Sequence, residues 1–260
     1  MKHLKFISIA FAAAIAVGCA TDPIADHVEY ASNQLKVLVA ECEPGDTATL
    51  LPRALGNDGS LIYTTPKGWT SGFFPGSLWY MYELTGDQYW ADKAARHTEI
   101  LEEVQYNVDH HDTGFMIGCS YGNGLRLTGK EEYKPIMVQA ARSLSTLFSP
   151  STGLIRSWGP NNGTVQKKGW KYAVIIDNMM NLELLFEAAK ISGDSTFYQI
   201  AISHADKTMK HHYRPDYSCY HVVDYVPETG DVNVRQTAQG YDDESVWARG
   251  QAWGLYGFTL

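Results

Sequence analysis

The sequence of 260 residues predicts an all-α protein, in which helical hairpins are wrapped into an α/α-barrel. Apolar segments end repeatedly at a glycine, namely Gly86, Gly129 and Gly193, and glycine accepts the left-handed conformation that closes a helix. Each stop is followed by a segment with more charge and one apolar face, which is typical of an outer helix. Long loops precede the apolar segments, so a ring of such hairpins would gather these loops at one mouth.

The helices are expected in a simple order along the chain. We predict a first helix at about residues 24–40, a loop at 51–70, and hairpins that pair 77–84 with 88–104, 121–127 with a helix starting at 131, and 176–191 with 197–210. The irregular spacing of the glycine stops disfavours a tetratricopeptide array. A further inner helix begins at Trp247 and runs to Leu260 without a cap or partner. We therefore expect the chain to be a C-terminally truncated, incomplete barrel.

The N-terminus has the layout of a signal peptide. Two lysines precede the apolar stretch 6–17, which is too short to span a bilayer and ends in Gly18-Cys19. The last four residues of this segment resemble a bacterial lipobox, in which Cys19 is lipidated. We expect residues 1–18 to be a lipoprotein signal peptide and 19–260 the barrel domain. The mature protein would be an exported bacterial lipoprotein, facing the periplasm or anchored in the outer membrane, although ordinary signal cleavage with a soluble product is the alternative.

Charge and cysteine content exclude several classes of function. The formal net charge is −8, which is unfavourable for nucleic-acid binding. Membrane contact is expected only through the lipid anchor. Beyond Cys19 the chain holds three cysteines and no CxxC pair, which argues against a disulfide framework and a structural zinc site.

The stretch 174–186 contains the leading catalytic candidate. Asp177 follows an apolar run and opens a helix that is too apolar for a surface. Apolar neighbours favour the protonated form of a carboxyl group, which suits a proton donor, whereas the helix N-terminus favours the anion. Asn181 lies at i+4 and is expected to reach the same carboxyl group. The alternative is that Asp177 merely caps its helix.

A set of polar and aromatic residues is expected to meet at the mouth. The set comprises Trp69, His111, Asp112, Asp177, His221, Gln239, Arg249 and Trp253. Asp112 precedes the second inner helix as Asp177 opens the third, so the two carboxyl groups would be neighbours. A carbohydrate site needs flat aromatic rings that pack against the sugar, together with polar side chains that form paired hydrogen bonds with its hydroxyl and carboxylate groups.

Each member of this set has a structural alternative. The run His110-His111-Asp112 could be part of a metal site, but no third ligand is evident. Arg249 could form a structural ion pair, and the tryptophans could be core. His204 is expected on an outer helix, and the pair at 211–212 at a solvated helix end.

Several separated motifs resemble one family of glycosidases. They are His111-Asp112-Thr113-Gly114-Phe115, Asp177-Asn178-Met179-Met180-Asn181, the segment 247–254 (WARGQAWG) and the segment 69–76 (WTSGFFPG). In this order they resemble the unsaturated glucuronyl hydrolases of glycoside hydrolase family 88, over about residues 60–260. The unsaturated rhamnogalacturonyl hydrolases of family 105 share the fold, but these motif forms look more like family 88.

The resemblance implies an (α/α)6 barrel and a specific reaction. Such enzymes remove the Δ4,5-unsaturated glucuronic acid that lyases leave at the non-reducing end of oligosaccharides, by hydrating its vinyl ether. The resemblance makes Asp177 the general acid/base and Asp112 a second essential aspartate. It places His221, Gln239, Arg249, Trp253 and, with them, Trp69 and His111 in the substrate pocket. No metal or organic cofactor is implied. An inverting glycosidase that uses both aspartates, and a glycan-binding lipoprotein without catalysis, remain alternatives.

Overall fold

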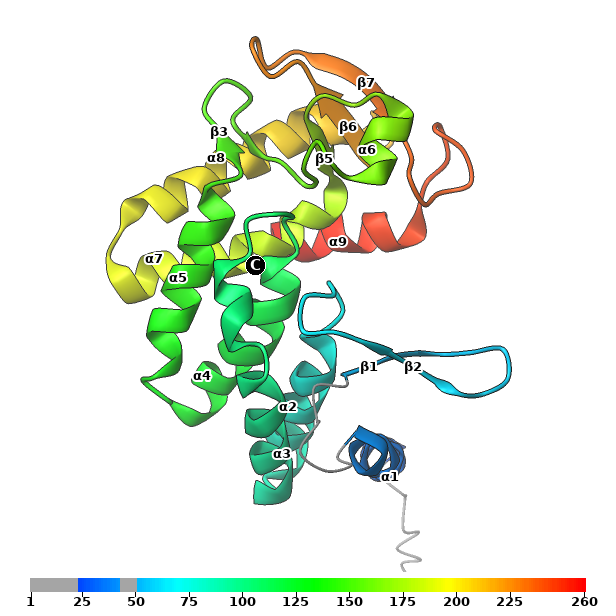
Figure 1. Cartoon of the computed structure of the whole chain (residues 1–260), viewed down its shortest axis with the longest axis vertical. Helices are drawn as coiled ribbons and strands as arrows, with labels where there is room; N and C mark the ends of the chain where they lie inside the picture. The colour runs from blue at the N-terminus through cyan, green and yellow to red at the C-terminus, as the bar shows by residue number, and fades with distance from the viewer. Residues whose placement is uncertain (1–22, 43–50) are drawn as a thin grey trace, which may run out of the picture.

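The computed structural model describes residues 23–42 and 51–260, and it is mainly helical (Figure 1). The all-α prediction is confirmed, whereas the predicted signal peptide and Cys19 lie outside the described residues. The helical segments are α1 (Pro23–Cys42), α2 (Phe73–Thr85), α3 (Gln88–Glu99), η2 (Glu102–Tyr106), η3 (Gly114–Gly122), α4 (Asn123–Thr128), α5 (Tyr133–Ser145), α6 (Gly163–Lys168), η4 (Ile176–Asn181), α7 (Leu182–Ser192), α8 (Ser195–His212) and α9 (Ala248–Thr259). None of the helices in these ranges combines the length and the apolar character that a membrane crossing requires.

The helices form hairpins that follow one another in an arc, from α2–α3 through η3–α4 with α5 and η4–α7 with α8 to α9 (Figure 1). The predicted glycine stops are confirmed, because Gly86, Gly129 and Gly193 all adopt positive φ angles at the ends of inner helices. An aspartate follows two of these stops and begins the outer helix: Asp87 accepts the N–H of Tyr89 at 3.0 Å, and the aspartate before α8 caps in the same way.

The regions predicted as loops contain short antiparallel strands. These are β1 (Leu51–Leu55) with β2 (Leu61–Thr64), β3 (Phe148–Ser149) with β4 (Leu154–Ile155), and the sheet β5 (Ala173–Ile175), β6 (Val222–Tyr225) and β7 (Val232–Gln236). The predictions of a loop at 51–70 and of long loops ahead of the inner helices were therefore wrong in part. Strands of two to five residues are too short for a clear periodic signal in the sequence.

The sheet matters because β5 runs directly into η4, the segment that carries Asp177. Val174 pairs with Val223, and Ile175 pairs with Val222, so the approach to Asp177 is fixed by a ladder of backbone hydrogen bonds. The final helix covers η4 from the other side. A Cβ at Gly257 of α9 would lie 2.7 Å from the carbonyl oxygen of Met179, so only glycine permits this close approach.

The inner segments begin with irregular turns. The second inner helix starts at Gly114 with a π-helical stretch, before the predicted start at residue 121, and η4 is a 3₁₀ turn. Both irregular turns occur where periodicity alone would predict regular α-helical hydrogen bonds, next to the candidate carboxylates Asp112 and Asp177. Such departures often accompany functional sites.

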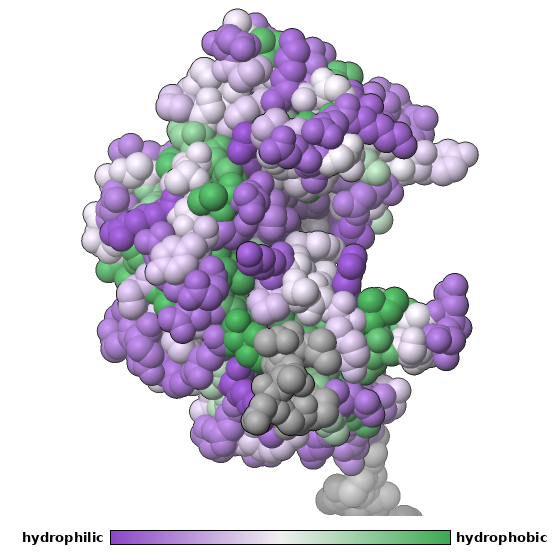
Figure 2. Space-filling view, viewed as in Figure 1, coloured by the Kyte–Doolittle hydropathy of each residue, from purple (hydrophilic) through white to green (hydrophobic). Residues whose placement is uncertain are grey.

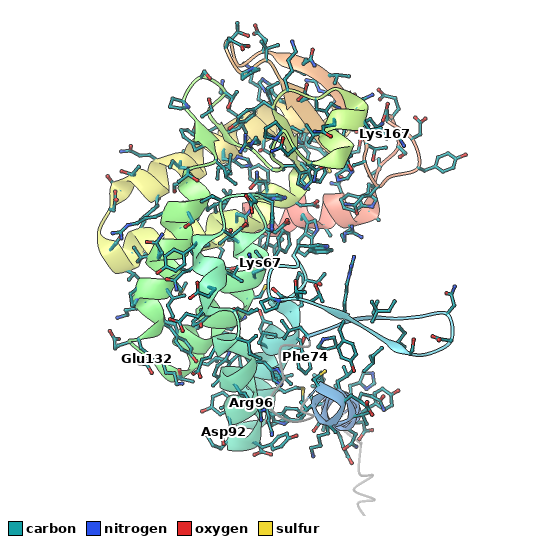
Figure 3. All side chains as sticks on the ribbon, in the orientation of Figure 1. Lys67, Phe74, Asp92, Arg96, Glu132 and Lys167 are labelled. Atoms are coloured by element: carbon teal, nitrogen blue, oxygen red, sulfur yellow. The ribbon has the colours of Figure 1, made fainter. Side chains whose placement is uncertain are left out.

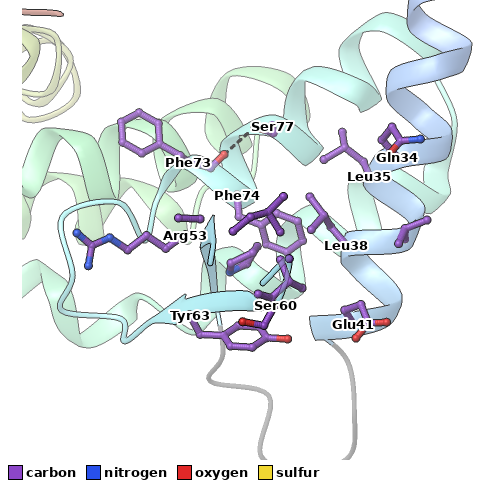
Figure 4. Close-up of a pocket in the computed structure, with 16 residues that line it drawn as sticks. Gln34, Leu35, Leu38, Glu41, Arg53, Ser60, Tyr63, Phe73, Phe74 and Ser77 are labelled. Atoms are coloured by element: carbon purple, nitrogen blue, oxygen red, sulfur yellow. Dashed lines mark hydrogen bonds between the residues drawn. The ribbon is translucent and has the colours of Figure 1, made fainter. Parts of the chain in front are cut away.

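A separate open pocket lies far from these turns along the chain. It is formed by α1, the hairpin β1–β2 and the start of α2, and has a volume of about 830 Å³ (Figure 4). Leu35 and Leu38 of α1 face Phe74 of α2 across it, while Ser77 donates to the carbonyl oxygen of Phe73 at 2.9 Å. The view in Figure 2 shows apolar residues at the hairpin and a hollow between it and the upper part of the molecule.

Candidate active site

Asp177 lies in the first turn of η4 and is buried, with 6% of its surface exposed. Its Oδ2 has no hydrogen-bond partner among the described residues. The residue before η4 is Ile175, and no side chain caps this turn, so the interpretation of Asp177 as a helix cap is wrong. Buried carboxyl oxygens are normally hydrogen-bonded, and an orphan one is a candidate for direct contact with a ligand.

The imidazole of His221 faces the carboxyl group of Asp177. Its Nε2 lies 3.8 Å from Oδ1 of Asp177, which is too long for a hydrogen bond. Its Nδ1 accepts the backbone N–H groups of Ala238 at 3.1 Å and Gln239 at 3.3 Å. In the neutral ring the proton therefore resides on Nε2 and faces Asp177. The ring of Trp247 fixes the imidazole, with 4.1 Å between ring centroids.

Asp112 is held between two histidines. Its Oδ2 lies 2.9 Å from Nδ1 of His110, and its Oδ1 lies 3.3 Å from Nε2 of His111. Burial opposes ionisation of Asp112, but the electrostatic interaction with His111 and the hydrogen bond from His110 outweigh it and hold the pKa of Asp112 below its usual range. Asp112 is therefore an anion at neutral pH.

Asn181 joins the two aspartate-bearing segments. Its Nδ2 lies 3.0 Å from Nδ1 of His111 and 2.7 Å from Oδ1 of Asn178, and its Oδ1 accepts the N–H of Gly114 at 2.8 Å. Since Asn181 donates to Nδ1, His111 carries its proton on Nε2, toward Asp112. The prediction that Asn181 reaches Asp177 was wrong. In a 3₁₀ turn with three residues per turn, residues i and i+4 do not share a face.

The two aspartates open onto one narrow cavity of about 70 Å³. The cavity is lined by Trp69, Asp112, Phe115, Trp158, Ile175, Asp177, Gln239, Arg249 and Trp253. Aromatic rings form much of its wall: Phe115 lies 4.9 Å from Trp253 and 5.7 Å from Trp69 between centroids. His111 and His221 do not line it, because they lie behind the carboxylates.

Three lining residues were not predicted from the sequence. Trp158 follows β4, in a region that was predicted as loop. Phe115 belongs to the motif 111–115 but was not predicted to line the site, and Ile175 is the last residue of β5. Trp158 stacks on Trp170 with 6.1 Å between centroids and 14° between planes. The sequence feature that could have indicated this part of the cavity wall is the presence of two tryptophans, twelve residues apart, in a polar loop.

Arg249 lies at the rim of the cavity and is exposed. It donates a hydrogen bond to Oε1 of Gln239, and its Cζ lies 4.2 Å from the ring centroid of Trp247. No carboxylate of the described residues forms an ion pair with Arg249, so the alternative of a structural ion pair finds no support there. The guanidinium is thus available to an anionic ligand.

The histidines of α8 differ from expectation. His212 is buried, not solvated, and its Nε2 contacts the carbonyl oxygen of Val174 at 3.1 Å. His204 does lie on α8, but it is fully buried and its Nδ1 accepts the N–H of Ile155 at 3.1 Å. The strands β4 and β6 contact this helix, and these strands were not predicted from the sequence.

The arrangement of motifs agrees with one family model. Residues 57–260 match the model described as Glycosyl Hydrolase Family 88. The chain belongs to this family. The resemblance of the motifs to family 88 is therefore confirmed.

Relatives within family 88 have consistent names. An unsaturated glucuronyl hydrolase of Formosa agariphila is 46% identical over 215 residues, which cover 82% of this chain and 52% of that protein. An unsaturated chondroitin disaccharide hydrolase of Streptococcus pyogenes is 38% identical over 197 residues, covering 74% of this chain and 48% of that protein. The chain spans about half the length of the curated relatives it matches.

A solved structure gives the same assignment for the fold. The crystal structure of an unsaturated glucuronyl hydrolase specific for heparin superposes with a TM-score of 0.81 at 43% identity, over 90% of this chain and 61% of that one. The solved structures of unsaturated glucuronyl hydrolases that resemble this chain have a six-hairpin helical barrel. The prediction of helical hairpins is therefore confirmed.

Proposed function

We propose that this family 88 protein removes Δ4,5-unsaturated glucuronic acid from the non-reducing end of lyase-generated oligosaccharides of the glycosaminoglycan type. The observation that carries the proposal is the contrast between the two carboxyl groups of one aromatic-walled cavity. Asp112 is an anion held by two histidines, whereas Asp177 lines the cavity and has a buried oxygen without a hydrogen-bond partner among the described residues. The names of the family 88 relatives support this substrate class.

The proposed chemistry needs one group that both gives and takes a proton. Asp177 protonates C4 of the vinyl ether, and water then adds at C5 while the Asp177 carboxylate accepts its proton. The resulting hemiketal opens, and the hemiacetal left at C1 releases the next sugar. Asp177 regains the proton that it gave, so a single carboxyl group completes the cycle, in contrast to the two carboxyl groups of ordinary glycosidases.

The neighbouring residues have defined parts in this proposal. The Nε2–H of His221 faces Oδ1 of Asp177 and steadies its anionic form after proton transfer. Arg249 at the rim offers a planar fork to the uronate carboxylate, and Trp253 and Phe115 provide apolar faces for the sugar ring. Asp112 holds the substrate or the attacking water through its exposed edge.

The test follows the ultraviolet absorbance of the conjugated C=C–carboxylate, which hydration removes. The protein is incubated with unsaturated chondroitin and heparin disaccharides, beside its Asp177→Asn variant. Loss of absorbance with the wild type alone would support both the reaction and its acid/base. No loss with any unsaturated disaccharide would reject the proposal, and release of sugar from saturated glycans would favour an inverting glycosidase that uses Asp112 and Asp177.

We further propose that the protein is exported and lipidated at Cys19. The basic start, the apolar stretch 6–17 and the small residues before Cys19 support this. Radiolabelled palmitate should enter the protein in a bacterial host and should not enter the Cys19→Ser variant. Equal labelling of both would reject the anchor.

A further inference from the structure

A short hairpin connects α8 to the segment that carries His221. It is formed by residues 213–219, whose first and last members pair in an antiparallel bridge. The N–H of Arg214 donates to the carbonyl oxygen of Ser218 at 2.8 Å, and the N–H of Tyr217 donates to the carbonyl oxygen of Arg214 at 2.9 Å. These bonds define a three-residue loop, which normally ends in a left-handed residue.

Tyr217 occupies this left-handed position, although the conformation favours glycine. Its φ is 66°, and among residues 23–42 and 51–260 it is the only residue other than glycine with a positive φ. The side chain of Tyr217 is exposed, so packing of its ring does not account for the conformation. Such strain persists where the surrounding structure holds the backbone in place. The hairpin therefore needs a contact from outside.

Gln251 of α9 supplies this contact. Its Oε1 accepts the N–H of Cys219 at 2.9 Å, and its Nε2 donates to the carbonyl oxygen of Tyr217 at 3.1 Å. One amide group thus holds the hairpin at the strained residue and at its end. Gln251 belongs to the motif 247–254 but does not line the active-site cavity, so the proposed reaction leaves its part unassigned.

The end of the hairpin leads directly to Asp177. His221 follows Cys219 after one residue, and its carbonyl oxygen accepts the N–H of Ile176 at 2.9 Å. Ile176 immediately precedes Asp177, and Nε2 of His221 lies 3.8 Å from Oδ1 of Asp177. A shift of the hairpin would therefore change the position of the imidazole relative to the carboxyl group.

Helix α9 is packed closely against η4, so Gln251 extends from a fixed support. A Cβ at Gly250 would lie 2.8 Å from Cγ2 of Ile176, and a Cβ at Gly254 would overlap the hydroxyl group of Tyr213. The helix thus approaches both η4 and the start of the hairpin without space for side chains. The two hydrogen bonds of Gln251 then set where the end of the hairpin lies relative to η4.

We infer that Gln251 is a positioning residue, which holds the hairpin 213–219 so that His221 stays aligned with Asp177. The inference rests on the proposed function for the reaction that is measured. The imidazole faces the carboxyl group while that group gives and regains its proton, so a stable distance between them preserves the rate. Loss of the contact should slow the chemical step and leave substrate binding nearly unchanged.

The test compares the kinetics of Gln251→Met with those of the wild type in the absorbance assay. Methionine has a similar helix propensity but does not donate a hydrogen bond and accepts one only weakly. Because a misplacement of about 1 Å lowers the rate by about 100-fold, we expect a smaller shift to lower kcat by about ten-fold and to change KM by less than about two-fold. Gln251→Glu keeps the acceptor for Cys219 and should lose less. A lower unfolding midpoint with an unchanged kcat would show a merely structural role and overturn the inference.

Tyr217→Gly distinguishes positioning from a general loss of stability. Glycine adopts the left-handed conformation without strain, so the hairpin no longer depends on Gln251 to keep its shape. Tyr217→Gly alone should keep the wild-type kcat. Combined with Gln251→Met, it should recover most of the kcat that Gln251→Met loses. A double variant as slow as Gln251→Met would overturn the inference.

Hydrogen exchange gives a readout that does not require turnover. The N–H groups of Cys219 and Ile176 are held by Gln251 and by the carbonyl oxygen of His221, so both should exchange faster in Gln251→Met. Unchanged exchange at Ile176 would overturn the inference. Faster exchange at both positions, in a protein whose wild type turns over no unsaturated disaccharide, would instead reject the proposed function and retain the hold of Gln251 on this segment.

Gln88→Met is the matched control. Gln88 lies on α3, and its Nε2 donates to Oδ1 of Asp92 at 2.9 Å. Figure 3 shows Asp92 at the lower end of the molecule, away from α9. Gln88→Met should leave kcat, KM and the exchange of Ile176 at their wild-type values. An equal fall of kcat in Gln88→Met and Gln251→Met would overturn the inference, since the effect would then not come from the hairpin.

Discussion

Gly114 and Asn181 bring the two candidate carboxylates into one site. The N–H of Gly114 donates to Oδ1 of Asn181 at 2.8 Å across 67 residues of sequence. The same approach leaves no space for a side chain, since a Cβ at Gly114 would overlap Oδ1 and lie 2.8 Å from Cα of Asn181. Asp112 lies two residues before Gly114, and Asp177 lies four residues before Asn181. The contact between Gly114 and Asn181 therefore sets the separation of the two carboxyl groups.

Replacing Gly114 with alanine is therefore expected to displace η4 from η3. Overpacking of this kind lowers the free energy of unfolding by about 1–3 kcal/mol. A displacement near 1 Å at the carboxylates would lower kcat by about 100-fold. Thermal unfolding and the absorbance assay measure the two effects.

Gly118 provides the matched control, because it lies in the same π-helical stretch and a Cβ there meets nothing within 4 Å. Gly118→Ala should retain activity and stability, since alanine is favoured over glycine inside a helix. Equal effects at both positions would show that the contact between Gly114 and Asn181 has no special role.

Asp112→Asn should change the protonation of a neighbouring histidine. Burial alone would lower the pKa of His110, but the hydrogen bond and the charge of Asp112 outweigh it and raise that pKa above its usual 6.5. Asparagine removes both effects and leaves the burial, so the pKa of His110 should fall. Titration of the His110 ring by nuclear magnetic resonance measures this shift.

Asp109→Asn is the control for loss of charge alone. The charge of Asp109 also raises the pKa of His110, but less than Asp112 does. Its replacement should lower that pKa by a smaller amount. A larger shift in Asp109→Asn than in Asp112→Asn would mean that the short contact between His110 and Asp112 is not formed in solution.

The sequence predicted the helices well because glycine stops and amphipathic faces are local signals. Gly86, Gly129 and Gly193 end helices for reasons contained in a few neighbouring residues. The strands β5 and β6 lie more than 45 residues apart and gain their stability from pairing and burial, which no local pattern reveals. The burial of His204 and His212 was missed for the same reason.

The candidate site was partly predictable. Five lining residues came from the motifs, because loops ahead of inner helices converge in a ring of hairpins; they are Trp69, Asp112, Asp177, Arg249 and Trp253. The hydrogen-bond partners of these residues could not be predicted from the motifs. Asn181 turns away from Asp177, because the segment is a 3₁₀ turn that the α-helical period does not describe. Trp158 required the placement of β4 next to the segment before Asp112.

The protein should lose stability in mild acid because of two buried histidines. Burial lowers the pKa of both His204 and His212 to about 3. Between about pH 6.5 and 3 each histidine binds a proton in the unfolded chain but not in the folded one, so stability is complete above the unfolded pKa and falls as the pH falls. Each contributes a slope of up to about 1.4 kcal/mol per pH unit.

His204→Asn tests this origin of acid sensitivity, because asparagine can accept the N–H of Ile155 without titrating. The variant should show a shallower dependence of unfolding free energy on pH between 6 and 4. His27→Asn on the exposed face of α1 should keep the wild-type slope. Unchanged slopes in both variants would assign the acid sensitivity to other groups.

Arg249→Lys should weaken substrate binding with little effect on folding. Arg249 is exposed, has no carboxylate partner among the described residues, and stacks at 4.2 Å on Trp247. Lysine keeps the charge but loses the planar fork that fits a uronate carboxylate, so KM should rise by about ten-fold or more while the unfolding midpoint stays nearly constant.

Arg126→Lys is the control for Arg249→Lys, because it shows whether replacing any exposed arginine with lysine changes KM. Arg126 forms a two-pronged ion pair with Glu83 at 2.6 and 2.8 Å, away from the cavity that Arg249 borders. Because exposed ion pairs contribute only about 0–1 kcal/mol, Arg126→Lys should leave KM unchanged and lower stability slightly. If Arg249→Lys instead lowered the unfolding midpoint and left KM at the wild-type value, its guanidinium would serve the packing of Trp247 and not the uronate, and recognition of the carboxylate would have to come from other groups of the cavity.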